Sequence, residues 1–318
     1  MTQYQFVGVD VAKDKFDVAL KIDKKFKLEC FSNDKKGYKA FLKWLDKYAP
    51  EAWVCMEATG HYSELIADFL VSAGIRVSVV NPLQIKSFAR AKLSRNKTDQ
   101  IDSKLIASYC EMMQPRTFSP RSEAHKELKE LSNLLDMLKA QHTQLSNQLG
   151  SAQSDAAKKA IRKLIQNLEK EIKKAEGLIA EIIKRDEVMN ENLKLMTSIK
   201  GIGKLTAYKV LSHVPHMNNF NNAKQFAAFI GISPRQHQSG NFQGKTTISR
   251  LGNSALRKSF YMAAMVAIRH NKVIAPFIMR LKEKGKAPKS IICAVMRKLA
   301  HLVFGVIKSK KPFSENFA

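Results

Sequence analysis

The stretch QFVGVDVAKDKFDVALK, residues 5–21, decides the fold of the amino-terminal third of the chain. β-Branched and aromatic residues dominate both halves, so it predicts two strands around a turn near Lys13-Asp14. The same reasoning and the helical period predict strands at 25–32, 52–56 and 75–80 and helices at 36–48 and 61–74. The resulting order, three strands, helix, strand, helix, strand, helix, is that of the RNase H fold, an α/β class.

Four carboxylates are distributed along this predicted fold. Asp10 lies in the centre of the apolar strand VGVDVA, where a carboxylate is costly to bury unless it is paired or bound to metal. Glu57 directly follows the strand 52–56. Asp99 and Asp102 have an i, i+3 spacing that places them on one helix face. Hard oxygen ligands suit Mg²⁺ or Mn²⁺, so the set predicts a divalent-metal site.

One of these acids, Asp99, and two others nearby, Asp14 and Asp17, also have simpler interpretations. An acid near a helix start is usually a cap, and either Thr98 or Asp99 can serve as one. Asp14 and Asp17, in the first predicted hairpin, fit solvated turn or strand positions better than a metal site.

The middle of the chain is predicted to be helical. No proline interrupts it between Pro120 and Pro215, and its apolar residues keep a heptad spacing. Two heptad seams are present, one of Leu128, Leu131, Leu135, Leu138, Leu145 and Leu149, the other of Ile161, Ile165, Leu168, Ile172, Ala175, Ile179 and Ile182. They predict an antiparallel hairpin or an intermolecular coiled coil. Helices that pack only on each other remain the alternative.

The last third begins with SIKGIGKLTAYKVLSHV at 198–214, which predicts a helix-hairpin-helix element. Gly201 and Gly203 would form the tight turn, and backbone N–H groups at the next helix start could meet a phosphate. A simple turn carries equal weight. A helix around Phe226, a polar loop from 231 to 253, and helices near 254–270 and 287–308 complete the mostly helical region.

These patterns predict three domains. Residues 1–120 are expected to form an RNase H-like catalytic domain, residues 121–193 a helical hairpin or coiled coil, and residues 194–318 a carboxy-terminal domain.

The net charge of the chain indicates which class of molecule the protein binds. The 318 residues carry a net charge of +26, of which +19 lies from Glu191 onward, where 22 Lys or Arg face three Glu and no Asp. Such a surface predicts nucleic acid as partner. A membrane partner is disfavoured, because no apolar run approaches the ~20 residues that span a bilayer. Four cysteines without CxxC spacing predict reduced thiols and a cytoplasmic protein.

Ser239 lies within the polar loop, before Gly240. A free serine needs a base or a cation to become a nucleophile. Its basic neighbours would hold a phosphate, and His237 is a possible base. Spacing alone does not separate it from Ser233, Ser249 or Ser254. A Ser-Gly pair is usually only part of a turn. The candidate nucleic-acid contacts are Lys97, Gly201, Gly203, Arg235, Lys245, Arg250, Arg257 and Lys258.

Five blocks carry a family resemblance: GVDVAKDKFDVAL, MEATGHY, NPLQIKSFARAKLSRNKTDQIDSKLIA, IKGIG and QFAAFIGISPRQHQSG…GKTTISRLGNSALRKSFYMAA. In this order they resemble the DEDD transposases of insertion sequences, the bridge-RNA-guided serine recombinases. The resemblance covers nearly the whole chain and is weakest in the heptad region. Phe260, where a Leu is common, is a small departure that does not touch the chemistry.

The resemblance implies a mechanism. A RuvC-like domain would bind Mg²⁺, or Mn²⁺, through Asp10, Glu57, Asp99 and Asp102, and Ser239 would become covalently joined to a DNA phosphate. The two halves of the site would come from different subunits of a dimer or tetramer held by the coiled coil. A structured bridge RNA would pair with donor and target DNA, in a prokaryotic cytoplasm at the nucleoid.

Two other functions fit the residues alone. The protein could be a metal-dependent junction resolvase or nuclease that uses water, with Ser239 only a turn residue. It could also be a non-catalytic nucleic-acid binder that uses the basic region and the helix-hairpin-helix.

The excess of positive charge predicts a steep salt dependence of DNA binding. A protein that neutralises 6–10 phosphates loses ~10³–10⁵ in affinity between 50 and 200 mM salt, because it displaces condensed counterions. Fluorescence anisotropy of a labelled duplex over a salt series measures the slope. A flat response would contradict this use of the charge.

Overall fold

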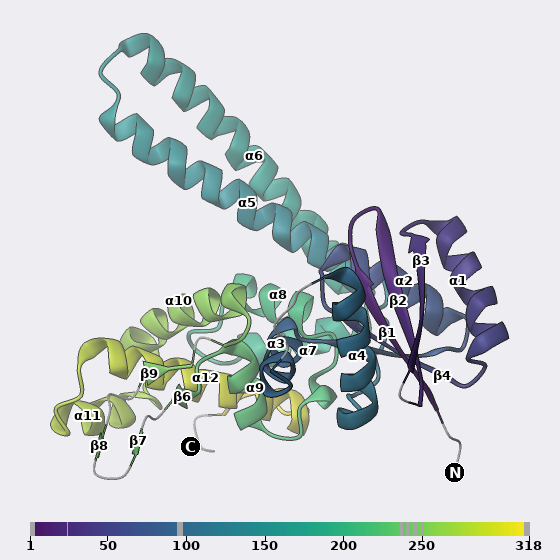
Figure 1. Ribbon diagram of the computed structural model, residues 1–318. Coiled ribbons are helices and arrows are strands. Elements are labelled where there is room, and N and C mark those ends of the chain that lie inside the picture. Colours follow the sequence, from purple (N-terminus) through teal and green to yellow (C-terminus); the bar gives the residue numbers. More distant parts are fainter. Residues whose placement is uncertain are drawn as a thin grey trace. The chain divides into compact units, whose positions relative to one another are not determined.

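The computed structural model describes residues 4–23, 25–93, 98–235, 238–239, 242–243, 247–249 and 251–314 (Figure 1). The chain divides into two units, Met1–Pro120 and Arg121–Ala318. Each unit has a hydrophobic core of its own.

A five-stranded mixed sheet forms the centre of the first unit, in the order β3-β2-β1-β4-β5. The strands are β1 (Gln5–Val11), β2 (Lys15–Ile22), β3 (Lys25–Ser32), β4 (Ala52–Glu57) and β5 (Arg76–Val80). β1 and β3 pair antiparallel with β2, whereas β4 runs parallel to both β1 and β5. Helices α1 (Lys35–Tyr48) and α2 (His61–Ser72) interrupt the strands in the predicted order. The arrangement is compatible with an RNase H-like domain.

Alternation along β1 divides its side chains between two layers. Val7, Val9 and Val11 are buried on the face covered by α1 and α2. Full burial of a valine contributes roughly 1.5–3 kcal/mol, so this face holds most of the core energy of the unit. Residues 6, 8 and 10 lie on the opposite face, which α3 (Pro82–Ala91) and α4 (Asp99–Met113) cover.

Gly8 allows α4 to pack directly on the sheet. A Cβ atom at this position would lie 2.1 Å from the Ser103 carbonyl oxygen and 2.3 Å from the Ala107 nitrogen. Both are backbone atoms of α4, which cannot rotate aside as a side chain could. The ion pair between Lys21 of β2 and Glu111 of α4 adds a second contact between the helix and the sheet. The glycine therefore sets how closely the helix that carries Asp99 approaches β1.

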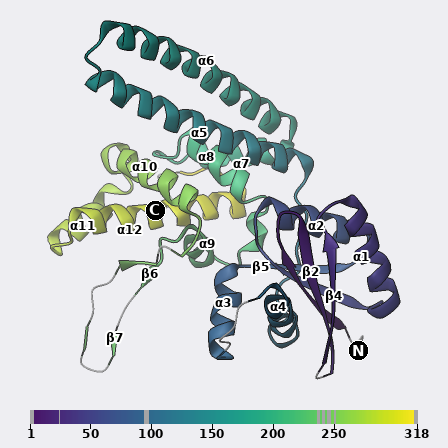
Figure 2. The ribbon, with the colours of Figure 1, turned by 45° about the horizontal axis from the view of Figure 1, so that its top comes forward.

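The second unit begins with a long helical hairpin, α5 (Glu123–Ser151) and α6 (Asp155–Arg185), which stands out in Figure 2. Leu128 and Leu135 of α5 and Ile179 and Ile182 of α6 are buried along the predicted seams. Their burial confirms that the seams face each other within one chain. Pairing of the hairpin with another chain stays a prediction.

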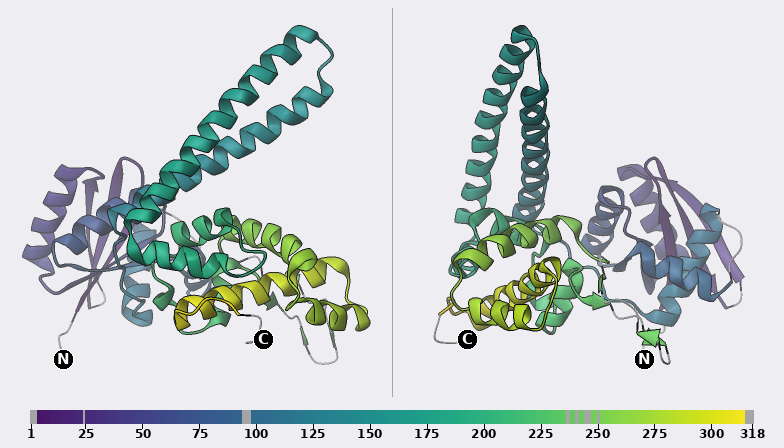
Figure 3. Two further views of the ribbon diagram at one scale, coloured as in Figure 1. Left: turned by 180° about the vertical axis from the view of Figure 1, so that it is seen from behind. Right: turned by 90° about the vertical axis from the view of Figure 1, so that its left-hand side faces the viewer.

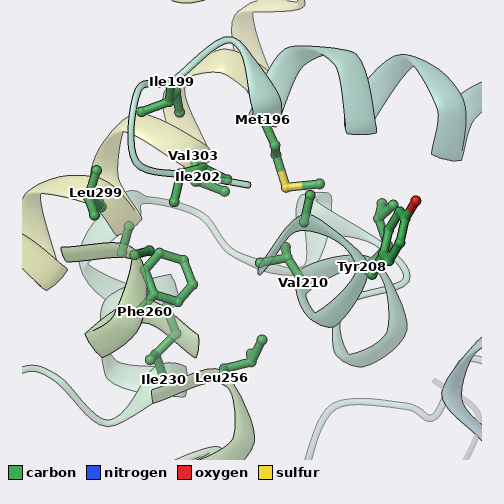
Figure 4. Close-up of a cluster of buried hydrophobic side chains, with 14 of the residues drawn as sticks. Met196, Ile199, Ile202, Tyr208, Val210, Ile230, Leu256, Phe260, Leu299 and Val303 are labelled. Atoms are coloured by element: carbon green, nitrogen blue, oxygen red, sulfur yellow. The ribbon is translucent and has the colours of Figure 1, made fainter. Parts of the chain in front are cut away.

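The rest of this unit consists mainly of helices around one core (Figures 3 and 4). They are α7 (Glu187–Thr197), α8 (Lys204–His213), the 3₁₀ turn η1 (Met217–Asn219), α9 (Ala223–Ile230), α10 (Ser254–His270), α11 (Ala275–Glu283) and α12 (Pro288–Ser309). Met196, Phe260 and Leu299 join α7, α10 and α12 in this core. The helices predicted near 254–270 and 287–308 are present, whereas the short α11 was not predicted.

Helix α12 is long and apolar enough to cross a membrane by length and composition. Val295, Leu299 and Val303 are nevertheless fully buried against the other helices of the unit. This packing explains its apolar composition as that of a core helix.

Substitution of Gly8 by Ala should destabilise the first unit. The added methyl group meets helix backbone, and overpacking of this kind costs about 1–3 kcal/mol, or more where backbone must move. Denaturant unfolding followed by circular dichroism measures the loss. Gly177→Ala is the control, because a Cβ atom there meets nothing within 4 Å and alanine favours the α6 helix. Equal stability of the Gly8→Ala variant and the wild type would contradict the packing argument.

Candidate active site

Three of the four predicted acids, Glu57, Asp99 and Asp102, lie near the fourth, Asp10, in the first unit. Asp10 is in β1, and Glu57 ends the parallel strand β4, one residue beyond the Val9–Met56 pair. Asp99 and Asp102 occupy the first turn of α4. Burial, followed by the negative charges of Asp102, Asp99, Glu57 and Asp17, raises the pKa of Asp10 from 3.8 to about 6. The acids are therefore close enough to repel one another.

A fifth acid belongs to this group, contrary to the sequence analysis. Asp17, predicted to be solvated, is only 8% exposed, whereas Asp14 is exposed as predicted. Asp17 pairs with Asp10 across the antiparallel β1–β2 register, so both side chains face α4. The signal was present in the sequence, because a hairpin with its turn near Lys13-Asp14 places residues 10 and 17 opposite each other.

Lys15 connects two of these carboxylates. Its Nζ atom lies 3.0 Å from Oδ2 of Asp17 and 3.1 Å from Oδ2 of Asp99. The hydrogen bond to Asp17, and then the one to Asp99, raise the pKa of Lys15 above its ordinary value. Asp17 and Asp99, which are far apart in the sequence, thus hold the Lys15 ammonium group beside the acids. The sequence did not predict this contact.

The start of α4 explains why Asp99 is available for this contact. Thr98 is the N-cap, and its hydroxyl accepts a hydrogen bond from the Ile101 N–H at 3.3 Å. Of the two possible caps, the structure therefore uses Thr98. The positive end of the helix dipole also favours the carboxylates of Asp99 and Asp102 in the first turn.

The donor chemistry of this cluster fits a hard divalent cation, because carboxylate oxygens are the preferred ligands of Mg²⁺ and Mn²⁺. In the described parts of the chain, no three Asp, Glu, His or Cys side chains are grouped so as to hold one ion. The carboxylates must therefore turn toward a common point to bind it. The side chain of Asp99 is 60% exposed and has room to rotate.

Ser239 lies in the second unit, on a short strand pair. β7 (Gln238–Ser239) pairs with β8 (Phe242–Gln243), and β6 (Pro234–Arg235) pairs with β9 (Thr247–Ile248). The prediction of an irregular loop over 231–253 was thus wrong for these strands. The Ser239 side chain and His237 lie outside the described residues.

The ends of this segment are fixed to helices. Gly252 has a φ of 150°, and a Cβ atom there would lie 2.4 Å from the Phe229 carbonyl oxygen. Asn253 caps α10 and donates from Nδ2 to Nδ1 of His213 at 3.0 Å. Burial lowers the pKa of His213 to about 4, so its ring is neutral and can accept this bond. The strands that lead toward Ser239 therefore start from fixed points.

The predicted nucleic-acid contacts differ in their surroundings. Arg235 of β6 and Lys258 of α10 are exposed. Arg257 is half-buried and donates to the Ile230 carbonyl oxygen at 3.1 Å, which joins α10 to the end of α9. Lys97, Lys245 and Arg250 lie outside the described residues.

The glycine turn between α7 and α8 has a packing role that the sequence did not reveal. Gly201 has a φ of 109°, and a Cβ atom there would lie 2.6 Å from Cβ of Ala267 in α10. Gly203 precedes α8 and has open space around it. Phosphate binding at this turn stays a prediction.

The comparisons with known proteins define the class. A family described as "Transposase", of the IS110 DEDD type, matches residues 7–154, which include the sheet and the four acids. A second, "Transposase IS116/IS110/IS902 family", matches residues 193–278, which include Ser239. The chain is thus a transposase, a class of DNA-cutting enzyme.

Similarity over the whole length identifies the family. The chain is 30% identical to pilin gene-inverting proteins of Moraxella bovis and Moraxella lacunata over 317 residues, 98% of each chain. It is 27% identical over 302 residues to the transposase for insertion sequence element IS1111A of Coxiella burnetii, covering 86% of this chain and 80% of the relative. This protein belongs to the IS110/IS116/IS902 family of transposases.

The raised pKa of Asp10 predicts a pH-dependent effect of Asp10→Asn on metal-free protein. The folded state binds the Asp10 proton more tightly than the unfolded state, so this group costs stability as pH rises from 3.8 to about 6. Asn avoids that cost. The difference in unfolding temperature between the Asp10→Asn variant and the wild type should therefore increase from pH 3.8 to about 6 and stay large at higher pH. Scanning calorimetry with chelator at a series of pH values tests this, and a gap independent of pH would contradict it.

Proposed function

We propose that this transposase cuts and rejoins the DNA of an insertion sequence through Ser239, supported by Mg²⁺ on Asp10, Glu57, Asp99 and Asp102. The observation that carries the proposal is the gathering of Glu57, Asp99 and Asp102 around Asp10. Mutually repelling carboxylates cost stability, which is unexpected in a domain that only binds DNA.

The bound metal would supply charge stabilisation for the attacking and leaving oxygens of an in-line phosphoryl displacement. The four acids would orient it by turning their carboxylates inward. Mn²⁺ could replace Mg²⁺, because both accept hard oxygen ligands.

Ser239 would be the nucleophile of the strand exchange. Its Oγ atom forms a bond to the scissile phosphorus while the bond from phosphorus to a deoxyribose oxygen breaks. The serine proton passes to a base, and the released oxygen is protonated as a sugar hydroxyl. Attack by a different DNA hydroxyl on the serine phosphodiester then reverses these steps and rejoins the strand. Excision, insertion and inversion can all proceed by this cycle, which suits a family with relatives named transposases and gene-inverting proteins.

The basic second unit would hold the polyanions. Arg235 and Lys258 are exposed and suit phosphate contacts, whereas Arg257 is partly engaged in holding α9. We propose donor and target DNA and a structured guide RNA as partners. The helical hairpin would join copies of the chain into a dimer or tetramer, so that an acidic cluster and a Ser239 of different copies can meet at one phosphate.

Two substitutions separate this function from its alternatives. Asp102→Asn should abolish DNA cleavage and leave DNA binding intact, because only the metal-binding chemistry is removed. Ser239→Ala should lower cleavage by about three orders of magnitude or more, the scale on which loss of a nucleophile acts. Cleavage of a labelled duplex that carries the element ends, with the guide RNA and Mg²⁺ present, measures both.

Matched controls are Asp14→Asn, an exposed acid of the same unit as Asp102, and Ser233→Ala, a serine directly before β6 of the neighbouring β6–β9 pair. Both should cleave as the wild type does. Cleavage by the Ser239→Ala variant at the wild-type rate would point to a nuclease that uses water. Absence of any cleavage by the wild type would point to a binding protein. Mass spectrometry of a trapped adduct should place the DNA on Ser239.

A further inference from the structure

Lys15 contacts the acidic cluster but is not one of the predicted ligands of a metal ion. Lys15 is the first residue of β2 and follows the turn between β1 and β2. The Ala12 N–H donates a hydrogen bond to the carbonyl oxygen of Lys15 at 2.9 Å. Residues 15 and 17 share one face of β2, which is the face of Asp10. The lysine side chain is therefore directed along the row of acids by the hairpin itself.

The two carboxylates that Lys15 contacts are not equivalent. The Asp17 side chain is 12% exposed, whereas the Asp99 side chain is 60% exposed. An exposed ion pair is weak and easily exchanged, whereas a buried carboxylate needs its partner. Lys15 is thus retained by Asp17 and only loosely held by Asp99.

An ammonium and a metal ion compete for the exposed Asp99 carboxylate, because the two cations repel each other at that distance. We propose that Lys15 is a built-in counter-ion, anchored on Asp17, which a divalent cation displaces from Asp99 as it binds. Lys15 is thus a positioning residue that shields the repelling acids before the metal arrives and lowers the affinity for that metal. The inference rests on the proposed function, in which Asp99 is a metal ligand.

Binding of Mn²⁺ to the full-length protein tests this inference, because free Mn²⁺ has a paramagnetic resonance signal that disappears on binding. Lys15→Met should lower the Kd by about tenfold, since a competing charge within ~4 Å of the ion is removed. Lys15→Arg keeps the charge and should bind Mn²⁺ nearly as the wild type does. Lys13→Met removes the same charge from an exposed position in the same turn and controls for long-range electrostatics.

Thermal unfolding gives a second readout. Without metal, Lys15→Met should unfold at a lower temperature than the wild type, because the acids lose their counter-ion. Saturating Mn²⁺ should close this gap. A gap that persists with Mn²⁺ would show that Lys15 only supports the fold, and would overturn the inference.

Failure of the inference is distinguishable from failure of the metal site. If Asp10→Asn abolishes Mn²⁺ binding but Lys15→Met and Lys13→Met change the Kd by the same factor, Lys15 does not compete at Asp99 and only the inference is wrong. If the wild type binds no Mn²⁺, or binds it independently of Asp10, the proposed metal site and the inference are both wrong.

Discussion

The direct packing of α4 on β1 at Gly8 is the constraint on which the candidate site depends. Any side chain at Gly8 would meet the backbone of α4 at Ser103 and Ala107. Because Asp99 and Asp102 begin this helix and Asp10 lies two residues after Gly8, a single close contact brings acids from distant segments together. The core face of the sheet, by contrast, contributes stability without reaching the site.

Close packing has an electrostatic consequence. Burial of Asp10, and then the repulsion from the carboxylates brought around it, raises its pKa to about 6. Lys15 offsets part of this repulsion by contacting Asp17 and Asp99. The same repulsion that destabilises the metal-free cluster would favour the binding of a divalent cation.

The second unit presents its candidate nucleophile in another way. Ser239 lies on a two-residue strand that pairs with β8. The carboxy-terminal end of its segment is fixed where Gly252 packs on the end of α9 and Asn253 contacts His213. The candidate site residues thus divide between the first unit, which carries the acids, and the basic second unit, which carries Ser239.

Local patterns in the sequence were sufficient for much of this protein. Periods of two and 3.6 residues predicted the five strands, α1, α2 and the helical hairpin, and the charge and motifs pointed to a DNA-cutting family, because these properties reside in neighbouring residues. Only the tertiary structure decided that Asp17 is buried, that Lys15 bridges to Asp99, and that Gly8 and Gly201 serve close packing. These facts depend on helix docking, which brings together residues as far apart in the sequence as Gly8 and Ala107, and no local pattern contains such distances.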